Sequence, residues 1–186
     1  MPILFPIFIP SVPTMPEDVR TARLLERLSR STFRARFHLS AADLALIRRR
    51  GLVEIRRHAE ALVRARLAPA VIPNDGRQTP WRGHPVFPAQ HATACCCRGC
   101  LFKWQGIPAG RALTDQEVES VVDLLLAWMR RELVRAGLDP EALLHPDPAA
   151  PEPVQPRTKP PRKALPRRPK ADGGEAAEDR MGSLFD

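Results

Sequence analysis

The sequence contains no tyrosine and few isoleucine or threonine residues, so the residue types that favour β-strands are scarce. Alanine, leucine, arginine and glutamate dominate, and these residues favour helices. No apolar run approaches the length of about 18 residues that a transmembrane helix needs, so no membrane association is expected. The composition predicts a mainly α fold: a small helical domain with a loop-rich Cys/His segment and a short β element at most.

Cysteine is absent from the whole chain except for one segment of six residues, which holds Cys95, Cys96, Cys97 and Cys100. The opening residues lack the positively charged region of a secretory signal, so we expect a cytoplasmic protein whose thiols are reduced. Clustered, reduced thiols favour metal binding or redox chemistry over a disulfide framework.

The 21 prolines are distributed unevenly and divide the chain into three parts. Residues 1–16 are expected to be a disordered or non-native extension, and Met15 is our hypothesis for the natural start. Residues 17–145 form the predicted helical Cys/His domain. Residues 146–186 are predicted to be a disordered, Pro-rich basic arm with an acidic and apolar tip.

Helix signals are clear on both sides of the cysteines. Ser40 is a good N-cap, and Gly51 is expected to end the helix that Ser40 begins. Thr114 and Glu117 form the pattern of a capping box at the start of another helix. Helices are predicted over residues 17–30, 40–50, 52–67, 95–105 and from 114 to Gly137.

The segment 68–94 is predicted to be a loop-rich connection. Pro80, Pro85 and Pro88 forbid a long central strand, so Val86-Phe87 is expected to form at most a short edge strand. A compact domain rarely contains so long an irregular segment without a reason, and a bound metal would supply one.

The residues 97–100 form a C-x-x-C unit, which at the start of a helix places both sulfur atoms on one face. The helix N-terminus and Arg98 would favour thiolate over thiol. Zinc takes four nitrogen or sulfur ligands in tetrahedral geometry. We therefore predict zinc as the cofactor and Cys95 as the spare thiol. The predicted ligands are His84, His91, Cys97 and Cys100, with Cys96 and His58 as contenders.

Three other interpretations of these residues stay open. The cysteines also fit small buried thiols with hydrogen-bonded histidines nearby, or a redox pair, although a redox C-x-x-C is expected beside strands that this sequence lacks. The third is a zinc hydrolase or deaminase, because His58-Ala-Glu60 and Cys97…Cys100 resemble the H-x-E…C-x-x-C signature. There Glu60 would move protons to the zinc-bound water, but His58 lies in a predicted helix where strands are expected.

The segments 73–87 (PNDGRQTPWRGHPVF), 89–94 (AQHATA) and 96–101 (CCRGCL), followed by Lys103-Trp104, resemble the bacterial domain-of-unknown-function family number 4186. The resemblance covers about residues 22–135 and implies little about activity. The family usually has threonine at the position of Cys95, which supports Cys95 as the spare thiol. It often has histidine at the position of Gln105.

Two features indicate partners. The net charge of +8 makes this a basic protein that suits a polyanion such as nucleic acid. The candidate phosphate-binding residues are Arg48, Arg49, Arg50, Arg56 and Arg57, for which a solvated helix face is the alternative. Near the C-terminus, Ser183, Leu184 and Phe185 resemble the peptide that docks bacterial sliding clamps.

The function that the sequence favours is a zinc-stabilised, non-enzymatic binding module, associated with DNA or with a DNA-processing partner. The alternatives are the zinc hydrolase or deaminase and a structural adaptor recruited by its C-terminal tail.

Overall fold

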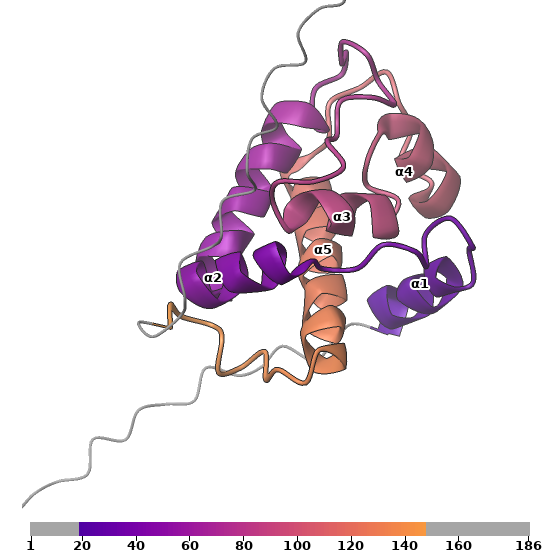
Figure 1. Ribbon diagram of the computed structural model, residues 1–186. Helices are drawn as coiled ribbons and strands as arrows, with labels where there is room; N and C mark the ends of the chain where they lie inside the picture. The colour runs from indigo at the N-terminus through magenta and orange to yellow at the C-terminus, as the bar shows by residue number, and fades with distance from the viewer. Residues whose placement is uncertain (1–18, 148–186) are drawn as a thin grey trace, which may run out of the picture. The chain divides into compact units, whose positions relative to one another are not determined.

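The computed structural model describes residues 19–147, and these fold into helices joined by loops, with no strand in that range (Figure 1). The mainly helical fold predicted from the sequence is therefore confirmed. The predicted extension at residues 1–16 and the arm beyond Asp147 lie outside the described residues. The helices are α1 (Val19–Ser29), α2 (Ala41–Arg66), α3 (Val86–Ala92), α4 (Arg98–Gln105) and α5 (Asp115–Arg135).

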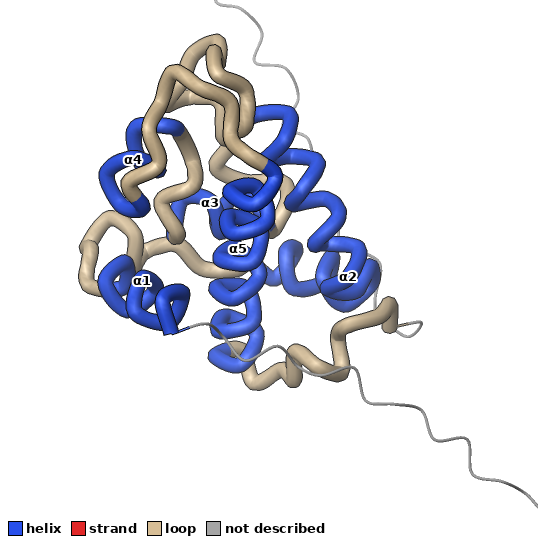
Figure 2. Tube along the Cα trace, turned by 180° about the vertical axis from the view of Figure 1, so that it is seen from behind, coloured by secondary structure: helices blue, strands red, loops and turns tan. Residues whose placement is uncertain are grey.

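The helix α5 is the centre of the fold, and α1, α2 and α3 all pack against it (Figures 1 and 2). It begins at the predicted capping box, in which the Thr114 hydroxyl accepts from the Glu117 N–H and the Glu117 carboxylate accepts from the Thr114 N–H. Eight of its side chains are buried, which is why it can contact helices on several sides: Val118, Val121, Val122, Leu124, Leu125, Leu126, Met129 and Leu133.

The two helices predicted on either side of Gly51 are the two halves of α2, which is kinked at that residue. Gly51 has φ 76° and ψ 154°, a conformation that essentially only glycine adopts. The kink frees the N–H groups of Leu52 and Val53, which donate to the carbonyls of Leu143 and Leu144 at 2.8 and 3.1 Å. The segment after α5 therefore returns to complete the hydrogen bonding of α2.

The prediction that Val86-Phe87 forms at most an edge strand missed α3, which contains both residues. Pro85 takes the N-cap position and Pro88 is the third residue of the helix. The first N–H groups of a helix have no intrahelical partner, so proline costs little there. The prolines that exclude a strand are thus compatible with the first turn of a helix.

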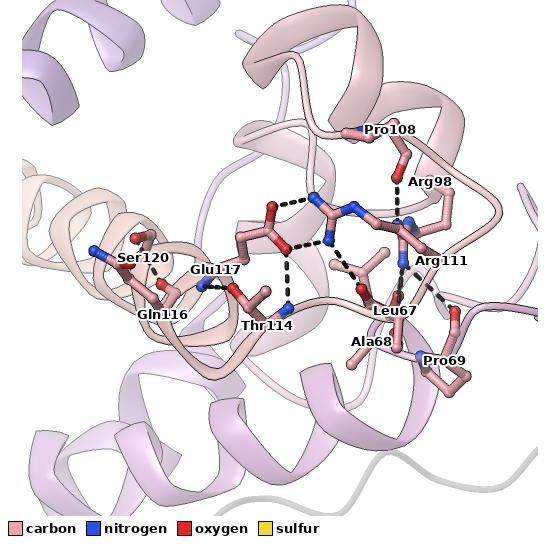
Figure 3. A network of polar contacts seen from close by, with 11 residues as sticks. Leu67, Ala68, Pro69, Arg98, Pro108, Arg111, Thr114, Gln116, Glu117 and Ser120 are labelled. Atoms are coloured by element: carbon pink, nitrogen blue, oxygen red, sulfur yellow. Dashed lines mark hydrogen bonds and ion pairs between the residues drawn. The ribbon is translucent and has the colours of Figure 1, made fainter.

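A buried arginine forms hydrogen bonds to the backbone at the start of the long loop that precedes α3. Arg98, which is 2% exposed, donates to the carbonyls of Leu67, Ala68 and Pro69 and, at 2.6 Å, to that of Pro108 (Figure 3). Two loops far apart in the sequence are joined in this way. Arg98 had been expected to favour thiolates at the cysteines, but its guanidinium group is bonded to carbonyls instead.

Candidate metal centre

Three of the four cysteines meet at the start of α4. Cys97 is the N-cap of this helix, and its sulfur accepts a hydrogen bond from the Cys100 N–H at 3.4 Å. The sulfur atoms of Cys96, Cys97 and Cys100 all lie within 4.8 Å of one another. Cys96 is buried, whereas Cys97 and Cys100 are partly exposed. Among the described residues this is the group of side chains that could hold a metal ion, and it includes Cys96 as a full member.

Arg34 contacts this group from the segment between α1 and α2. Its guanidinium group donates to the Cys100 sulfur at 3.1 Å, to the Cys96 sulfur at 3.7 Å and to the His91 carbonyl. The side chain is buried, at 7% exposure. The one local signal for Arg34 in the sequence is its place between Phe33 and Phe37. Arg34, and not Arg98, is therefore the arginine that can favour thiolate over thiol at the cysteines.

The three thiols do not ionise alike. Hydrogen bonds from the Cys96 and Cys97 thiols, with Arg34 adding its donors and its charge, lower the pKa of Cys100 to about 2. The same hydrogen bond to Cys100 raises the pKa of Cys96, and burial raises it further. Without a metal the group therefore carries one thiolate, at Cys100, and two thiols that donate to it. A metal that binds all three sulfur atoms must displace two protons.

Cys95 takes no part in this group. It is fully buried, its sulfur accepts from the Gln105 side-chain amide at 3.2 Å, and burial raises the pKa of its thiol to about 11. A thiol that stays protonated in this way is a poor metal ligand.

The two predicted histidine ligands are held in other contacts. The His91 Nε2 lies 3.1 Å from the Pro80 carbonyl, and burial lowers the pKa of its ring. His84 accepts at Nδ1 from the Val86 N–H at 3.2 Å, and its Nε2 lies 3.0 Å from His58 Nδ1. The structure thus brings together Cys97 and Cys100 of the predicted set but groups neither histidine with them. The complete four-ligand set stays a prediction.

The tautomers of the His58–His84 pair follow from these contacts. A backbone N–H can only donate, so His84 is unprotonated at Nδ1 and carries its proton at Nε2. His58 then accepts at Nδ1 and donates from Nε2 to the Glu54 carboxylate at 3.1 Å. Every ring nitrogen of the pair therefore has a hydrogen-bond partner. Adding a proton to either ring would break one of these hydrogen bonds.

The residues of the deaminase alternative are not assembled into one site. His58 is bonded to His84 and Glu54, and Glu60 forms an ion pair with Arg64 at 2.9 Å on α2. Within residues 19–147 the candidate metal group contains neither of them. The geometry gives no support to this alternative.

The predicted phosphate-binding arginines lie on α2, and several are already paired. Arg56 bonds Asp123 and Arg57 bonds Glu54, both at 2.5 Å, while Arg48 pairs with Asp147 at 3.7 Å. Arg49 and Arg50 line a shallow hollow with Val53, Glu54 and Pro146. The predicted docking residues Ser183, Leu184 and Phe185 lie outside the described residues.

In the described part of the chain, no helix combines the length and the apolar character needed to cross a bilayer. A family model described as "Domain of unknown function (DUF4186)" matches residues 22–130. No solved structure matches the chain.

Proposed function

The chain belongs to the DUF4186 family, and from its site we propose that it is a zinc-stabilised binding module in which Cys96, Cys97 and Cys100 hold the metal. The observation that carries this proposal is the approach of three sulfur atoms to within 4.8 Å of one another at the first turn of α4. Three adjacent thiols that share hydrogen bonds are a donor set for a soft metal ion.

The spacing of the sulfur atoms favours a single zinc ion. Zinc bonds sulfur at about 2.3 Å in a tetrahedron, so two thiolates on one zinc lie about 3.8 Å apart. Sulfur atoms within 4.8 Å of one another reach that spacing by small side-chain rotations. A 4Fe–4S cluster holds each thiolate on a separate iron and needs ligands that are more widely spread.

The charge of the site also supports zinc. A divalent ion with three thiolates carries a net charge of about −1, and burying such a charge is costly unless it is paired. Arg34 supplies the balancing positive charge from its buried position. A thiolate sulfur has several lone pairs, so it can accept from Arg34 while it binds the metal.

The fourth position of the tetrahedron decides between a structural and a catalytic role. A fourth protein ligand, for which His84 and His91 are the sequence's candidates, would close the site, whereas a water molecule would leave it open. We favour the structural role because the group lies where irregular segments meet. The Thr79 hydroxyl donates to the Cys96 carbonyl at 2.8 Å, and Asp75 accepts from the Arg98 N–H at 3.1 Å.

The test is the zinc content of purified protein, measured for wild type, Cys97→Ser and the matched control Cys95→Ser. Wild type and Cys95→Ser are expected to carry about one zinc per chain, and Cys97→Ser much less, because a serine hydroxyl is a poor substitute for a thiolate. The proposal fails if wild type carries no stoichiometric zinc, or if Cys97→Ser retains as much as the control.

A thiol redox function is the second candidate, because the pKa of Cys100 is lowered beside two further thiols. It predicts metal-free protein in which a mild oxidant joins the Cys100 thiolate to the Cys97 or Cys96 thiol as a disulfide, with two electrons passing to the oxidant and one proton released from the thiol. Alkylation of the denatured protein followed by mass measurement distinguishes that disulfide from thiols protected by zinc.

A further inference from the structure

An exposed group of aromatic rings and arginines lies beside the thiols, and we call it the ring patch: Phe33, Arg36, Phe37, Trp81 and Arg82. The Trp81 ring stacks on His91 at 4.3 Å with 7° between the planes, and Phe37 stacks on the same imidazole at 5.2 Å and 15°. His91 is fixed by its bond to the Pro80 carbonyl. Trp81 also stacks with Phe37 at 5.9 Å and 10°, and it is nevertheless 58% exposed, so much of its ring faces solvent.

Arg36 is held over the rings of the patch and not by carboxylates. The Arg36 guanidinium carbon lies 4.2 Å from the centre of the Phe33 ring and 5.5 Å from that of Phe37. Within residues 19–147 the structure records no ion pair for Arg36 or Arg82. These two differ in this respect from Arg56 and Arg57 on α2, whose charges are compensated by Asp123 and Glu54.

The chain segments that carry the patch contain no acidic residue at all. No aspartate or glutamate occurs in residues 27–42 or in residues 76–114, whereas arginine recurs in both. A patch built from these segments has flat, open rings beside uncompensated positive charge. Phosphates would be attracted to the guanidinium groups, and the rings offer their faces to other flat groups.

We propose that the ring patch binds single-stranded nucleic acid. Unpaired bases would stack on the exposed part of the Trp81 ring, while Arg36 and Arg82 would contact the phosphates. Bases in a duplex have their faces covered by their neighbours, so the patch favours an unpaired strand. This surface differs from the arginine cluster on α2 that the sequence suggested.

The inference rests on the proposed function in one respect, because Arg34 connects the two sites. Its guanidinium group donates to the thiols and to the carbonyl of His91, the residue on which the patch rings stack. Zinc at the thiols would hold Arg34, and through it the stack, in place. The two ideas remain separable, because the exposed patch residues can be changed without touching a sulfur contact.

The experiment measures binding of a fluorescently labelled oligo-dT of about 15 nucleotides by anisotropy, with a duplex of equal length alongside. Trp81→Ala is compared with Phe102→Ala, an exposed ring on α4 outside the patch. Arg36→Ala is compared with Arg64→Ala, because both remove one positive charge from an exposed side chain and Arg64 is paired with two carboxylates. Zinc content is measured on every sample.

Wild type is expected to bind the single strand several-fold more tightly than the duplex. Trp81→Ala should weaken binding by about tenfold, in the range of losing one stacked base. Arg36→Ala should lower the slope of log affinity against log salt by about 0.7, the contribution of one phosphate contact. Both controls should bind within about twofold of wild type, and zinc content should be unchanged in all variants.

Equal losses in the patch variants and their controls would overturn the proposal, as would a wild type that carries zinc but binds no oligonucleotide at low salt. If Trp81→Ala instead abolishes self-association seen by sedimentation, the patch is an interface between copies of this chain and the proposal is wrong. Absence of zinc together with intact, Trp81-dependent binding would reject the proposed function and leave this inference standing.

Discussion

Arg34 and Arg98 are the buried arginines of the described residues, and only Arg34 contacts the thiols. Arg34 donates to two sulfur atoms and to the His91 carbonyl, whereas Arg98 donates to backbone carbonyls of other segments. The sequence could not distinguish them, because Arg98 lies inside the C-x-x-C unit while Arg34 is more than sixty residues away. Which one reaches the thiols is decided by tertiary packing.

His84 predicts a pH dependence of stability at the scale of one residue. Burial, with the nearby His58 ring, lowers the pKa of His84 from 6.5 to about 4. Above about pH 6.5 the His84 ring is neutral in both the folded and the unfolded state, so its protonation takes nothing from the stability of the fold. As the pH falls from about 6.5 to about 4, only the unfolded state gains the proton, so stability is lost. After allowance for screening at a partly exposed ring, the loss is on the order of 2 kcal/mol.

The measurement is urea unfolding of wild type and His84→Asn between pH 7 and pH 4.5. Asparagine can still accept from the Val86 N–H but cannot ionise, so the wild type should lose more stability than the variant across this range. Other titrating groups are common to both proteins and cancel in the difference. Parallel profiles would show that His84 does not keep a lowered pKa.

At the scale of elements, local signals in the sequence predicted most helices. Thr114 with Glu117 forms the expected capping box, and Ser40, expected as an N-cap, forms a capping box with Asp43. The helix that the sequence did not predict is α3, because its prolines occupy positions that are allowed in the first turn of a helix as well as in a loop.

The candidate site was predicted in part: Cys97 and Cys100 meet, with Cys96 beside them. The contacts that separate the histidines from the thiols are long-range, so no local pattern indicates them.

Gly51 allows a test of the kink in α2. A Cβ at this position would lie 2.6 Å from the His145 carbonyl carbon, and its positive φ is strained for any side chain. Gly51→Ala should therefore lower the free energy of unfolding by more than about 3 kcal/mol. Gly137→Ala is the control, because Gly137 has φ 74° but open space around it, and about 1 kcal/mol is expected there. Denaturant unfolding of both variants measures the difference, and equal losses would contradict the role of the close approach.

At the scale of the whole molecule, the fold extends beyond the residues that the family model matches. The match ends at residue 130, whereas Leu133 and Leu143 are buried in the core. Each buried leucine contributes roughly 1.5–3 kcal/mol, so losing both removes a large share of a typical domain's stability. A chain ending at residue 130 should therefore lack a cooperative thermal transition in circular dichroism, whereas one ending at residue 147 should show one. Equal transitions would mean that the returning segment is dispensable.

The C-terminal residues predict a partner that the described fold does not test. Because Ser183, Leu184 and Phe185 resemble a clamp-docking peptide, the full chain should be retained by an immobilised sliding clamp. A chain with Leu184→Ala and Phe185→Ala should lose most of that retention, because the apolar pair would fill the groove. Equal recovery of both proteins ends this hypothesis.

The kink at Gly51 also sets an order of events during synthesis. The N–H groups of Leu52 and Val53 leave the ribosome about ninety residues before the carbonyls of Leu143 and Leu144 that accept from them. At 5 to 20 residues per second, that is a delay of roughly 5 to 18 seconds. During this interval the carbonyl acceptors of the Leu52 and Val53 N–H groups have not yet been synthesised. The native hydrogen bonds at the kink between the two halves of α2 therefore cannot form. The last described residues to emerge are the ones that complete the fold.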